Sequence, residues 1–206
     1  MTAVRKRKTD TRYGEALAGV RRMARKVEPE PGHAFQVCRV SEQLFDATSA
    51  LHGLGPHART LLSAAALLHD VGLALGANAH HKLARDLILG YELPGFTERE
   101  RMMIACIARY HRKGMPKPTH KVFRDLDKEE QAVVVRLAAL LRIGDGFDRA
   151  HDAAVRRLNV KQEDRQVTIL AHMRHPSPTD LWGASRKTDL FENTFGVKVL
   201  IESKEE

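Results

Sequence analysis

The sequence predicts a mainly α-helical bundle that ends in a small α+β element. From Tyr13 to about residue 143, apolar residues recur at the three- and four-residue spacing of helices. Beyond residue 152 the pattern changes to short strand-like runs separated by turn residues. With 206 residues, 43% of them hydrophobic, the chain has enough apolar material for one domain with its own core.

We expect each helix and strand to be bounded by turn-forming residues. The expected helices cover about 12–27, 31–50, 57–70, 80–90, 97–111, 127–143 and 179–194. Pro29 and Pro31 end the first helix, and the run 144–146 (Gly-Asp-Gly) ends the one before the strands. The expected strands cover 155–160, 166–172 and 197–201. We expect Trp182, Phe191 and Phe195 to fill the core of the α+β element.

These elements group into a basic flexible tail (1–11), a helical domain (12–152) and a small α+β subdomain (153–206) packed on it. Cys38 and Cys106 lie in apolar helical patterns, as reduced core residues of a cytoplasmic protein do. No run approaches the roughly 18 apolar residues of a membrane helix. The basic N-terminus also lacks the apolar stretch of a secretory signal. We therefore expect a cytoplasmic protein with no membrane partner.

The net charge of +8 comes from two basic segments. Residues 1–26 carry a net charge of +7 and residues 109–124 one of +6, whereas the rest of the chain is slightly acidic. A basic chain suggests nucleic-acid binding. However, we find no recognition-helix pattern, and only 5% of residues are aromatic and able to stack on bases. We therefore expect no nucleic-acid partner, and the second basic segment is either a solvated loop or a phosphate-binding segment.

Several predicted helices each place one polar residue in register with an apolar face. These residues are His33, His69, His81, His111 and Asp145. His69, for example, follows Leu62 and Ala65 by seven and four residues, a spacing that shares one helix face. Burying one such group without a partner costs about 2–7 kcal/mol. A shared divalent cation would satisfy all of them, and Asp70, next to His69, adds a carboxylate.

Each of these residues also has a simpler interpretation. A single core histidine is more often hydrogen-bonded than bound to a metal. Asp70 can cap a helix or pair with an arginine, and Asp145 can be a turn residue between two glycines. His80 competes with His81 for the same role. The pattern leaves open whether one or two ions bind, and whether they are Mn, Fe, Zn, Co or Mg.

The set His33, His69-Asp70 and Asp145 resembles the HD superfamily of metal-dependent phosphohydrolases. The segments LLSAAALLHDVG (61–72), IARYHRKGMPK (107–117), VVRLAALLRIGDGFDRAH (134–151) and LWGASRKTDLFENTFGVKVLI (181–201) are similar to the C-terminal, HD-like half of the exopolyphosphatase / guanosine-pentaphosphate phosphohydrolase (Ppx/GppA) family. The resemblance covers about 12–202 and implies an HD-domain helical bundle and a homodimer. Family members also carry an actin-like half that hydrolyses polyphosphate, for which 206 residues leave no room.

We therefore expect a stand-alone HD-type phosphohydrolase that acts on a nucleotide or another phosphate ester. The expected metal ligands are His33, His69, Asp70, Asp145, His81 and His111. Asp70 and Asp145 are also the expected catalytic residues, which orient the attacking water or take its proton. The expected phosphate-binding residues are Lys82, Arg85, Arg109, Arg112, Lys113, Lys117, Lys121, Arg142 and Arg149. The alternative is a non-catalytic module that binds polyphosphate or a nucleotide, or docks on a separate actin-like half.

Overall fold

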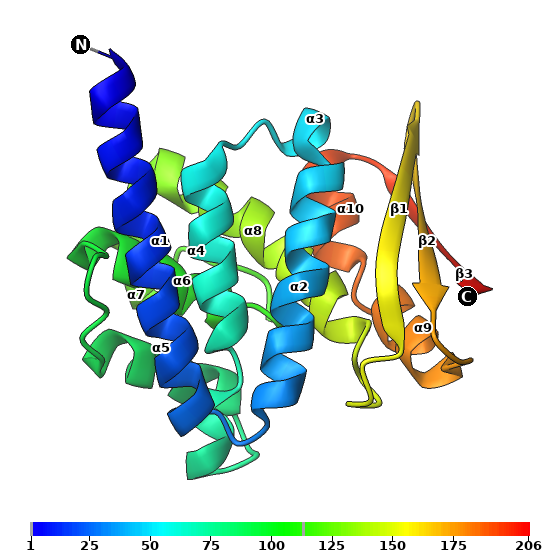
Figure 1. Ribbon diagram of the computed structural model, residues 1–206, viewed down its shortest axis with the longest axis horizontal. Coiled ribbons are helices and arrows are strands. Elements are labelled where there is room, and N and C mark those ends of the chain that lie inside the picture. Colours follow the sequence, from blue (N-terminus) through cyan, green and yellow to red (C-terminus); the bar gives the residue numbers. More distant parts are fainter. Residues whose placement is uncertain (1, 113) are drawn as a thin grey trace.

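Helices make up most of the protein, and a small sheet lies beside them (Figure 1), which confirms the predicted fold class. The structure, a computed structural model, describes residues 2–112 and 114–206, with side chains from residue 12 onward. The helices are α1 (Thr2–Val27), α2 (Pro31–Ala47), α3 (Ser49–His52), α4 (Pro56–Leu67), α5 (His80–Gly90), α6 (Glu98–Arg109), α7 (Lys121–Arg124), α8 (Lys128–Gly146), α9 (Pro178–Ser185) and α10 (Asp189–Phe195), with a 3-10 helix at Val71–Leu75. The strands are β1 (Val155–Glu163), β2 (Gln166–Met173) and β3 (Lys198–Glu205).

The expected tail at 1–11 falls on residues whose side chains lie outside the described part of the chain. The expected domain boundaries stay predictions. Within the described part, the sheet and the last two helices pack against α2 and α8 of the helical bundle.

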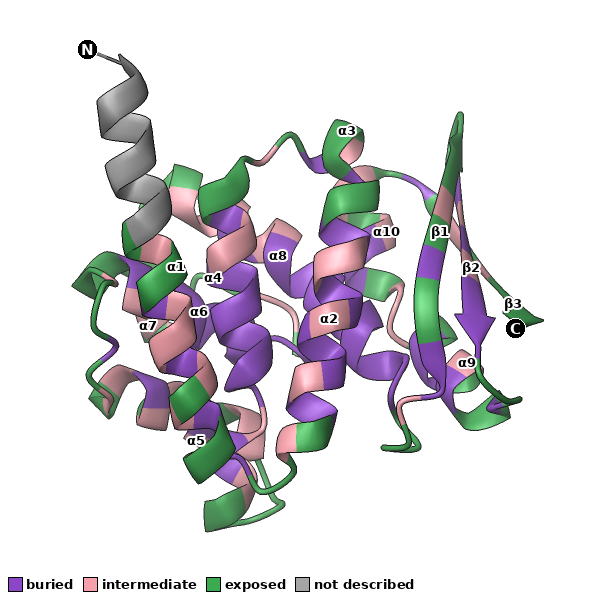
Figure 2. Ribbon diagram, in the orientation of Figure 1, coloured by how far each residue is buried: buried purple, intermediate pink, exposed green. Residues whose placement is uncertain are grey.

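Helix α4 lies at the centre of the bundle because its second half, from Leu61 to Leu67, is buried on every side. All of its residues from Leu61 to Leu67 are buried, and α1, α2, α6 and α8 pack around it (Figure 2). A helix without a polar face needs such neighbours on all sides. The segment Pro56–Leu75 is long and apolar enough to cross a membrane, but 67% of it is buried in the fold, as is normal for a core helix. Cys38 and Cys106 are buried and free, as expected.

Helix α8 continues through the Gly144-Asp145-Gly146 run, so the expectation that it ends there is wrong. The two glycines make room for neighbouring helices instead of ending this one. A Cβ at Gly144 would lie 2.2 Å from Ser41 Oγ in α2, and one at Gly146 would lie 2.6 Å from the Cα of Ala184 in α9. Asp145 therefore sits on the last turn of a helix that is held from two sides.

Strand β2 is the middle strand of the sheet, antiparallel to β1 and parallel to β3. The sheet docks on α2 through amide side chains: Gln36 Nε2 donates to Val155 O (2.8 Å), and Gln43 Oε1 accepts from Leu158 N (2.8 Å). The parallel pairing requires a crossover, which α9 and α10 provide. One helix at 179–194 was expected, but the chain turns at 186–188 between the two.

The expected aromatic core of this element is only partly correct. Phe191 is fully buried, and Phe195 is half-buried and packs against it, with 4.6 Å between ring centres. Trp182 on α9 is instead 59% exposed. Because α9 buries Gly183 and Ala184 against α8, the adjacent Trp182 faces outward.

Candidate metal centre

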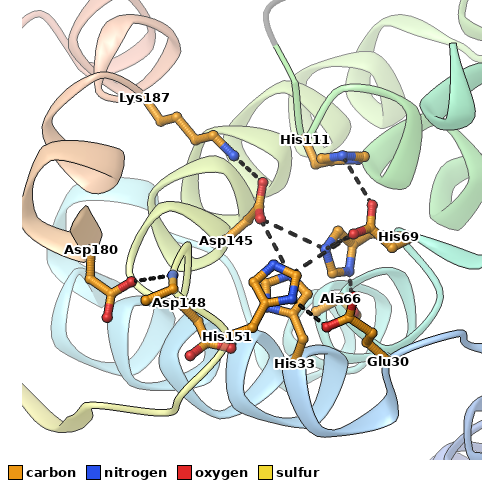
Figure 3. A network of polar contacts seen from close by, with 12 residues as sticks. Glu30, His33, Ala66, His69, His111, Asp145, Asp148, His151, Asp180 and Lys187 are labelled. Atoms are coloured by element: carbon orange, nitrogen blue, oxygen red, sulfur yellow. Dashed lines mark hydrogen bonds and ion pairs between the residues drawn. The ribbon is translucent and has the colours of Figure 1, made fainter. Parts of the chain in front are cut away.

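Histidine and aspartate side chains from separate helices and turns meet in one place. They are His33 near the start of α2, His69 and Asp70 after α4, His80 at the start of α5, His111 after α6, and Asp145 in the last turn of α8. We call these residues the His–Asp cluster. Figure 3 shows how His33, His69, His111 and Asp145 point toward one another.

The first half of the cluster consists of His33, His69, Asp70 and Asp145. Nε2 of His33 lies 3.5 Å from Asp145 Oδ1 and 3.9 Å from Asp70 Oδ2. Nε2 of His69 lies 3.6 Å from Asp70 Oδ2 and 3.9 Å from Asp145 Oδ1. Two imidazole nitrogens and two carboxylate oxygens this close together form a donor set that suits first-row divalent metals.

The second half of the cluster uses the other oxygen of Asp70. Asp70 Oδ1 lies 3.3 Å from His80 Nε2 and 3.5 Å from His111 Nε2, and the two Nε2 atoms are 3.4 Å apart. Two groups of side chains are arranged so that each could hold a metal ion. One group is His33, His69 and Asp70, and the other is Asp70, His80 and His111. Asp70 therefore belongs to both groups and has the position of a bridging carboxylate.

The structure brings His80, and not the expected His81, to Asp70. The ring centre of His81 is 6.5 Å from that of His111, and within the described residues its buried Nδ1 has no hydrogen-bond partner. His81 was expected because it shares a face with Ala84 and Ile88. His80, however, is the first residue of α5, and because Cα–Cβ bonds tilt toward the N-terminus, its side chain extends past the helix end.

Each histidine of the cluster is held through its Nδ1 atom, so that its Nε2 atom faces the cluster. Nδ1 of His69 lies 2.8 Å from Ala66 O, that of His111 2.7 Å from Ala108 O, and that of His80 3.1 Å from Ala77 O. Nδ1 of His33 instead contacts the Asp148 carboxylate at 2.8 Å. A carbonyl oxygen accepts only from a protonated Nδ1, so each neutral ring presents an unprotonated Nε2 to the cluster.

The surroundings of His69, His111 and Asp70 favour charge states that bind metal. Burial lowers the pKa of His69, and it lowers the pKa of His111 to about 3, so both rings are neutral near pH 7. Burial alone would raise the pKa of Asp70, but the neighbouring His69, His80 and His111 hold it well below its usual range. His69 is fully buried, and in the described part of the chain its Nε2 has no hydrogen-bond partner, which leaves this atom free to bind a metal.

His33 differs from His69 and His111 in its charge, and the hydrogen bond to Asp70 also raises the pKa of His80. Burial opposes the positive charge of His33, yet hydrogen bonds to Asp145 and Asp148 raise its pKa to about 10. His33 must therefore release a proton when it ligates a metal. Metal binding through this ring should then strengthen as the pH rises.

The amino-acid sequence also matches a known family. A model of the Ppx/GppA phosphatase family, domain III, matches residues 17–177. The chain belongs to this family. The guanosine-5'-triphosphate,3'-diphosphate pyrophosphatase of Pseudoalteromonas translucida (strain TAC 125) is 35% identical over 68 residues, which are 33% of this chain and 13% of that protein. The protein of the same name from Aliivibrio fischeri (strain ATCC 700601 / ES114) is 28% identical over 110 residues, which are 53% of this chain and 22% of that protein.

These alignments fall far short of the full length of the curated relatives. The matched parts of this chain correspond to between 13% and 22% of those two proteins. What their names describe is therefore a property of the longer proteins. The chemistry of this Ppx/GppA domain III depends on its own side chains.

Three neighbours of the cluster in this Ppx/GppA domain III were not expected from its sequence. Asp148 holds His33, and His151 stacks on the His33 ring with 4.0 Å between centres and 6° between planes. The Lys187 ammonium contacts Asp145 Oδ2, as Figure 3 shows. Asp148 lies three residues after Asp145, a spacing that could have revealed it. Nothing in the sequence relates Lys187 to Asp145, 42 positions away.

The expected phosphate-binding residues do not all line one cavity. Arg112, Arg142 and Arg149 line a single cavity together with Trp182, Gly183, Arg186, Lys187 and Asp189. Lys82, Lys117 and Lys121 are exposed and are not part of this lining, Arg109 is half-buried beside the Tyr110 ring, and Arg85 pairs with Asp86. Lys113 lies outside the described residues.

Arg142 has a mainly structural setting in this cavity. It is 1% exposed, and its guanidinium donates to Tyr110 O (2.7 Å), Gly114 O (2.5 Å) and Asp189 (2.9 Å). These bonds tie the chain after α6 to α8 and α10. A guanidinium engaged in this way has few donors left for a phosphate, so its expected role stays a prediction.

Proposed function

We propose that this chain is a metal-dependent phosphohydrolase of the HD type that acts without an actin-like half on a nucleotide or another phosphate ester. One observation carries the proposal: four Nε2 atoms, each from a ring held through its Nδ1, converge on the two oxygens of Asp70 and on Asp145. A shared cation would offset the folding energy that burying these groups together costs.

His33, His69, Asp70 and Asp145 would hold one ion, and Asp70, His80 and His111 a second, with Mn, Fe, Zn, Co and Mg as candidates. His80 takes the place first expected for His81. When bound, such ions lower the pKa of a water molecule and neutralise phosphate charge. Asp70 and Asp145 remain ionised near neutral pH and are placed to accept a proton from the attacking water. The exposed arginines beside Asp145 attract the substrate's phosphate.

The test combines metal analysis with a substrate panel. Protein purified with Mn or Fe should contain about one or two ions per chain by elemental analysis and should hydrolyse at least one nucleotide or phosphate ester. His69→Ala should lose both the metal and the activity. His175→Ala, which changes an exposed histidine outside the cluster, should keep both. Equal activity in His69→Ala and the unmodified protein would overturn the proposal.

The second candidate is a non-catalytic module that binds polyphosphate or a nucleotide, or docks on a separate actin-like half. It is considered because the matched segments make up only 13% and 22% of the two curated relatives. Polyphosphate binding without turnover and without bound metal would support this module and exclude the enzyme.

We also propose a cytoplasmic location and a homodimer, both carried over from the sequence and the family resemblance. Sedimentation of the purified chain at several concentrations tests the dimer. A single species with the mass of one chain, 23.1 kDa, would contradict it.

A further inference from the structure

A cavity of about 280 Å³ lies beside the His–Asp cluster, between the chain after α6, the end of α8, and α9 with the turn that follows it. Its lining residues are Arg112, Arg142, Arg149, Trp182, Gly183, Arg186, Lys187 and Asp189. Lys187 connects it to the cluster, because its ammonium contacts Asp145 Oδ2. We call this space the Trp182 cavity.

The positive charge of the Trp182 cavity is only partly neutralised. Asp189 pairs with Arg142 at 2.9 Å, and Asp145 pairs with Lys187. Arg112, Arg149 and Arg186 are exposed, and no carboxylate of the described residues forms an ion pair with any of them. These unpaired guanidiniums around one hollow form a site for a small anion with several oxygens, for which guanidinium geometry is well suited.

Trp182 gives the cavity a second kind of binding surface. It is the only tryptophan of the chain, and its side chain is 59% exposed although the nearby Phe191 is fully buried. An exposed indole in a cavity lined by arginines adds nothing to the binding of a phosphate chain. It does provide a flat face on which a nucleobase stacks, whatever the base.

The two surfaces are fixed relative to each other by the contact between α8 and α9. A Cβ at Gly183 would lie 2.5 Å from Gly146 O and 3.1 Å from Arg149 Cβ, so the backbones touch and the Arg149 side chain lies directly against α9. Trp182 is the residue before Gly183. The indole and the Arg149 guanidinium therefore extend from one rigid base, and no loop movement is needed to bring them together.

We propose that the Trp182 cavity binds a nucleoside mono- or diphosphate, with the base against Trp182 and the phosphates against Arg112, Arg149 and Arg186. The volume is near the lower end of the range for small-molecule sites, which fits one base with a short phosphate group. The terminal phosphate points to Lys187 and so toward Asp145. This direction rests on the proposed function, whereas the binding itself needs neither metal nor turnover.

The single tryptophan makes the binding directly measurable. Metal-free protein in EDTA is titrated with ADP and, separately, with inorganic pyrophosphate, and Trp182 fluorescence is recorded. We expect saturable quenching by ADP and a dissociation constant about tenfold or more below that for pyrophosphate, since stacking contributes to the first ligand only. Equal affinity for the two ligands would overturn the proposal.

Two variants separate the contributions, with calorimetry replacing fluorescence where the tryptophan is lost. Trp182→Leu should remove the preference for ADP over pyrophosphate, and Arg186→Ala should weaken the binding of both ligands. The control Arg124→Ala, an exposed arginine outside the cavity, should change neither. An unchanged preference in a Trp182→Leu protein that melts like the unmodified chain would overturn the proposal.

Asp145→Asn distinguishes this inference from the proposed function. If that variant and the unmodified protein both bind ADP but neither hydrolyses any ester, the enzyme proposal fails and the nucleotide site stands. If the unmodified protein hydrolyses phosphate esters but shows no preference for a ligand with a base, the nucleotide site fails and the enzyme proposal stands.

Discussion

Glu28 lies beside the His–Asp cluster, and burial strongly disfavours the negative charge of its carboxylate. It is 5% exposed, and burial together with the nearby Asp70 raises its pKa to about 8. A carboxyl whose folded-state pKa exceeds its unfolded value stabilises the fold below the unfolded value. That contribution is lost as the pH rises through the folded pKa, here between about 4.5 and 8.

We therefore expect Glu28→Gln to gain stability relative to the unmodified protein as the pH rises from 5 to 9. The gain is of the order of a few kcal/mol, because each unit of pKa shift corresponds to about 1.4 kcal/mol. Urea unfolding of metal-free protein at several pH values measures it. Glu202→Gln, at an exposed carboxyl of β3, is the matched control. A stability difference that does not vary with pH would contradict the prediction.

A metal ion bound at the cluster would compete with Lys187 for the Asp145 carboxylate. The Lys187 ammonium contacts Asp145, and together with a hydrogen bond from His33 it holds the pKa of that carboxyl well below its usual range. An ion that uses Asp145 gains less when a cation already neutralises the carboxylate. Lys187→Met should therefore bind Mn²⁺ more tightly, by about tenfold for a difference of about 1.4 kcal/mol.

Calorimetric titration of metal-free protein with Mn²⁺ checks this expectation. Lys198→Met is the matched control, because this exposed lysine pairs with Glu192 away from the cluster. Weaker Mn²⁺ binding in Lys187→Met than in the control would show that Lys187 supports the metal site and does not compete with it.

Among the elements, helix ends were harder to predict than helix interiors. The repeat of apolar residues correctly indicated α5 at 80–90 and placed most of the cluster, because periodicity reports which face is buried. It could not show that α8 continues through two glycines, because the reason is a contact with α2 and α9 that are distant in sequence. For the same reason it missed Lys187 and the outward position of Trp182.

The close contact between α8 and α9 predicts a clear difference between two glycines. Gly146→Ala places a Cβ 2.6 Å from the Cα of Ala184, which is backbone and cannot rotate away. We expect a loss of about 1–3 kcal/mol in the free energy of unfolding. Gly14→Ala in α1 has nothing within 4 Å of its new Cβ and should be neutral or stabilising. Urea unfolding of both variants tests this, and equal effects would contradict it.

At the scale of the whole molecule, a bound ion would join segments that the chain keeps far apart. The cluster draws on α2, the turn after α4, the start of α5, the turn after α6 and the end of α8. An ion that binds only the folded arrangement stabilises it by mass action. At about one hundred times the dissociation constant, this amounts to about 2.7 kcal/mol.

We expect Mn²⁺ or Zn²⁺ to raise the melting temperature of EDTA-treated protein by about 5–10 °C under these conditions. His69→Ala should show little or no rise, and the exposed His175→Ala should behave like the unmodified protein. Differential scanning calorimetry provides the measurement. An equal rise in His69→Ala would mean that the ion stabilises the protein at another place.

The backbone contact between Gly146 and Gly183 also has a geometric consequence. It joins the helix turn that carries Asp145 to the helix that carries Trp182, with no side chain between them to yield. Neither helix can slide along the other without separating the two backbones. The backbone distance between residue 182 and Asp145 is therefore fixed, and the nucleotide site proposed above would favour ligands long enough to reach from one to the other.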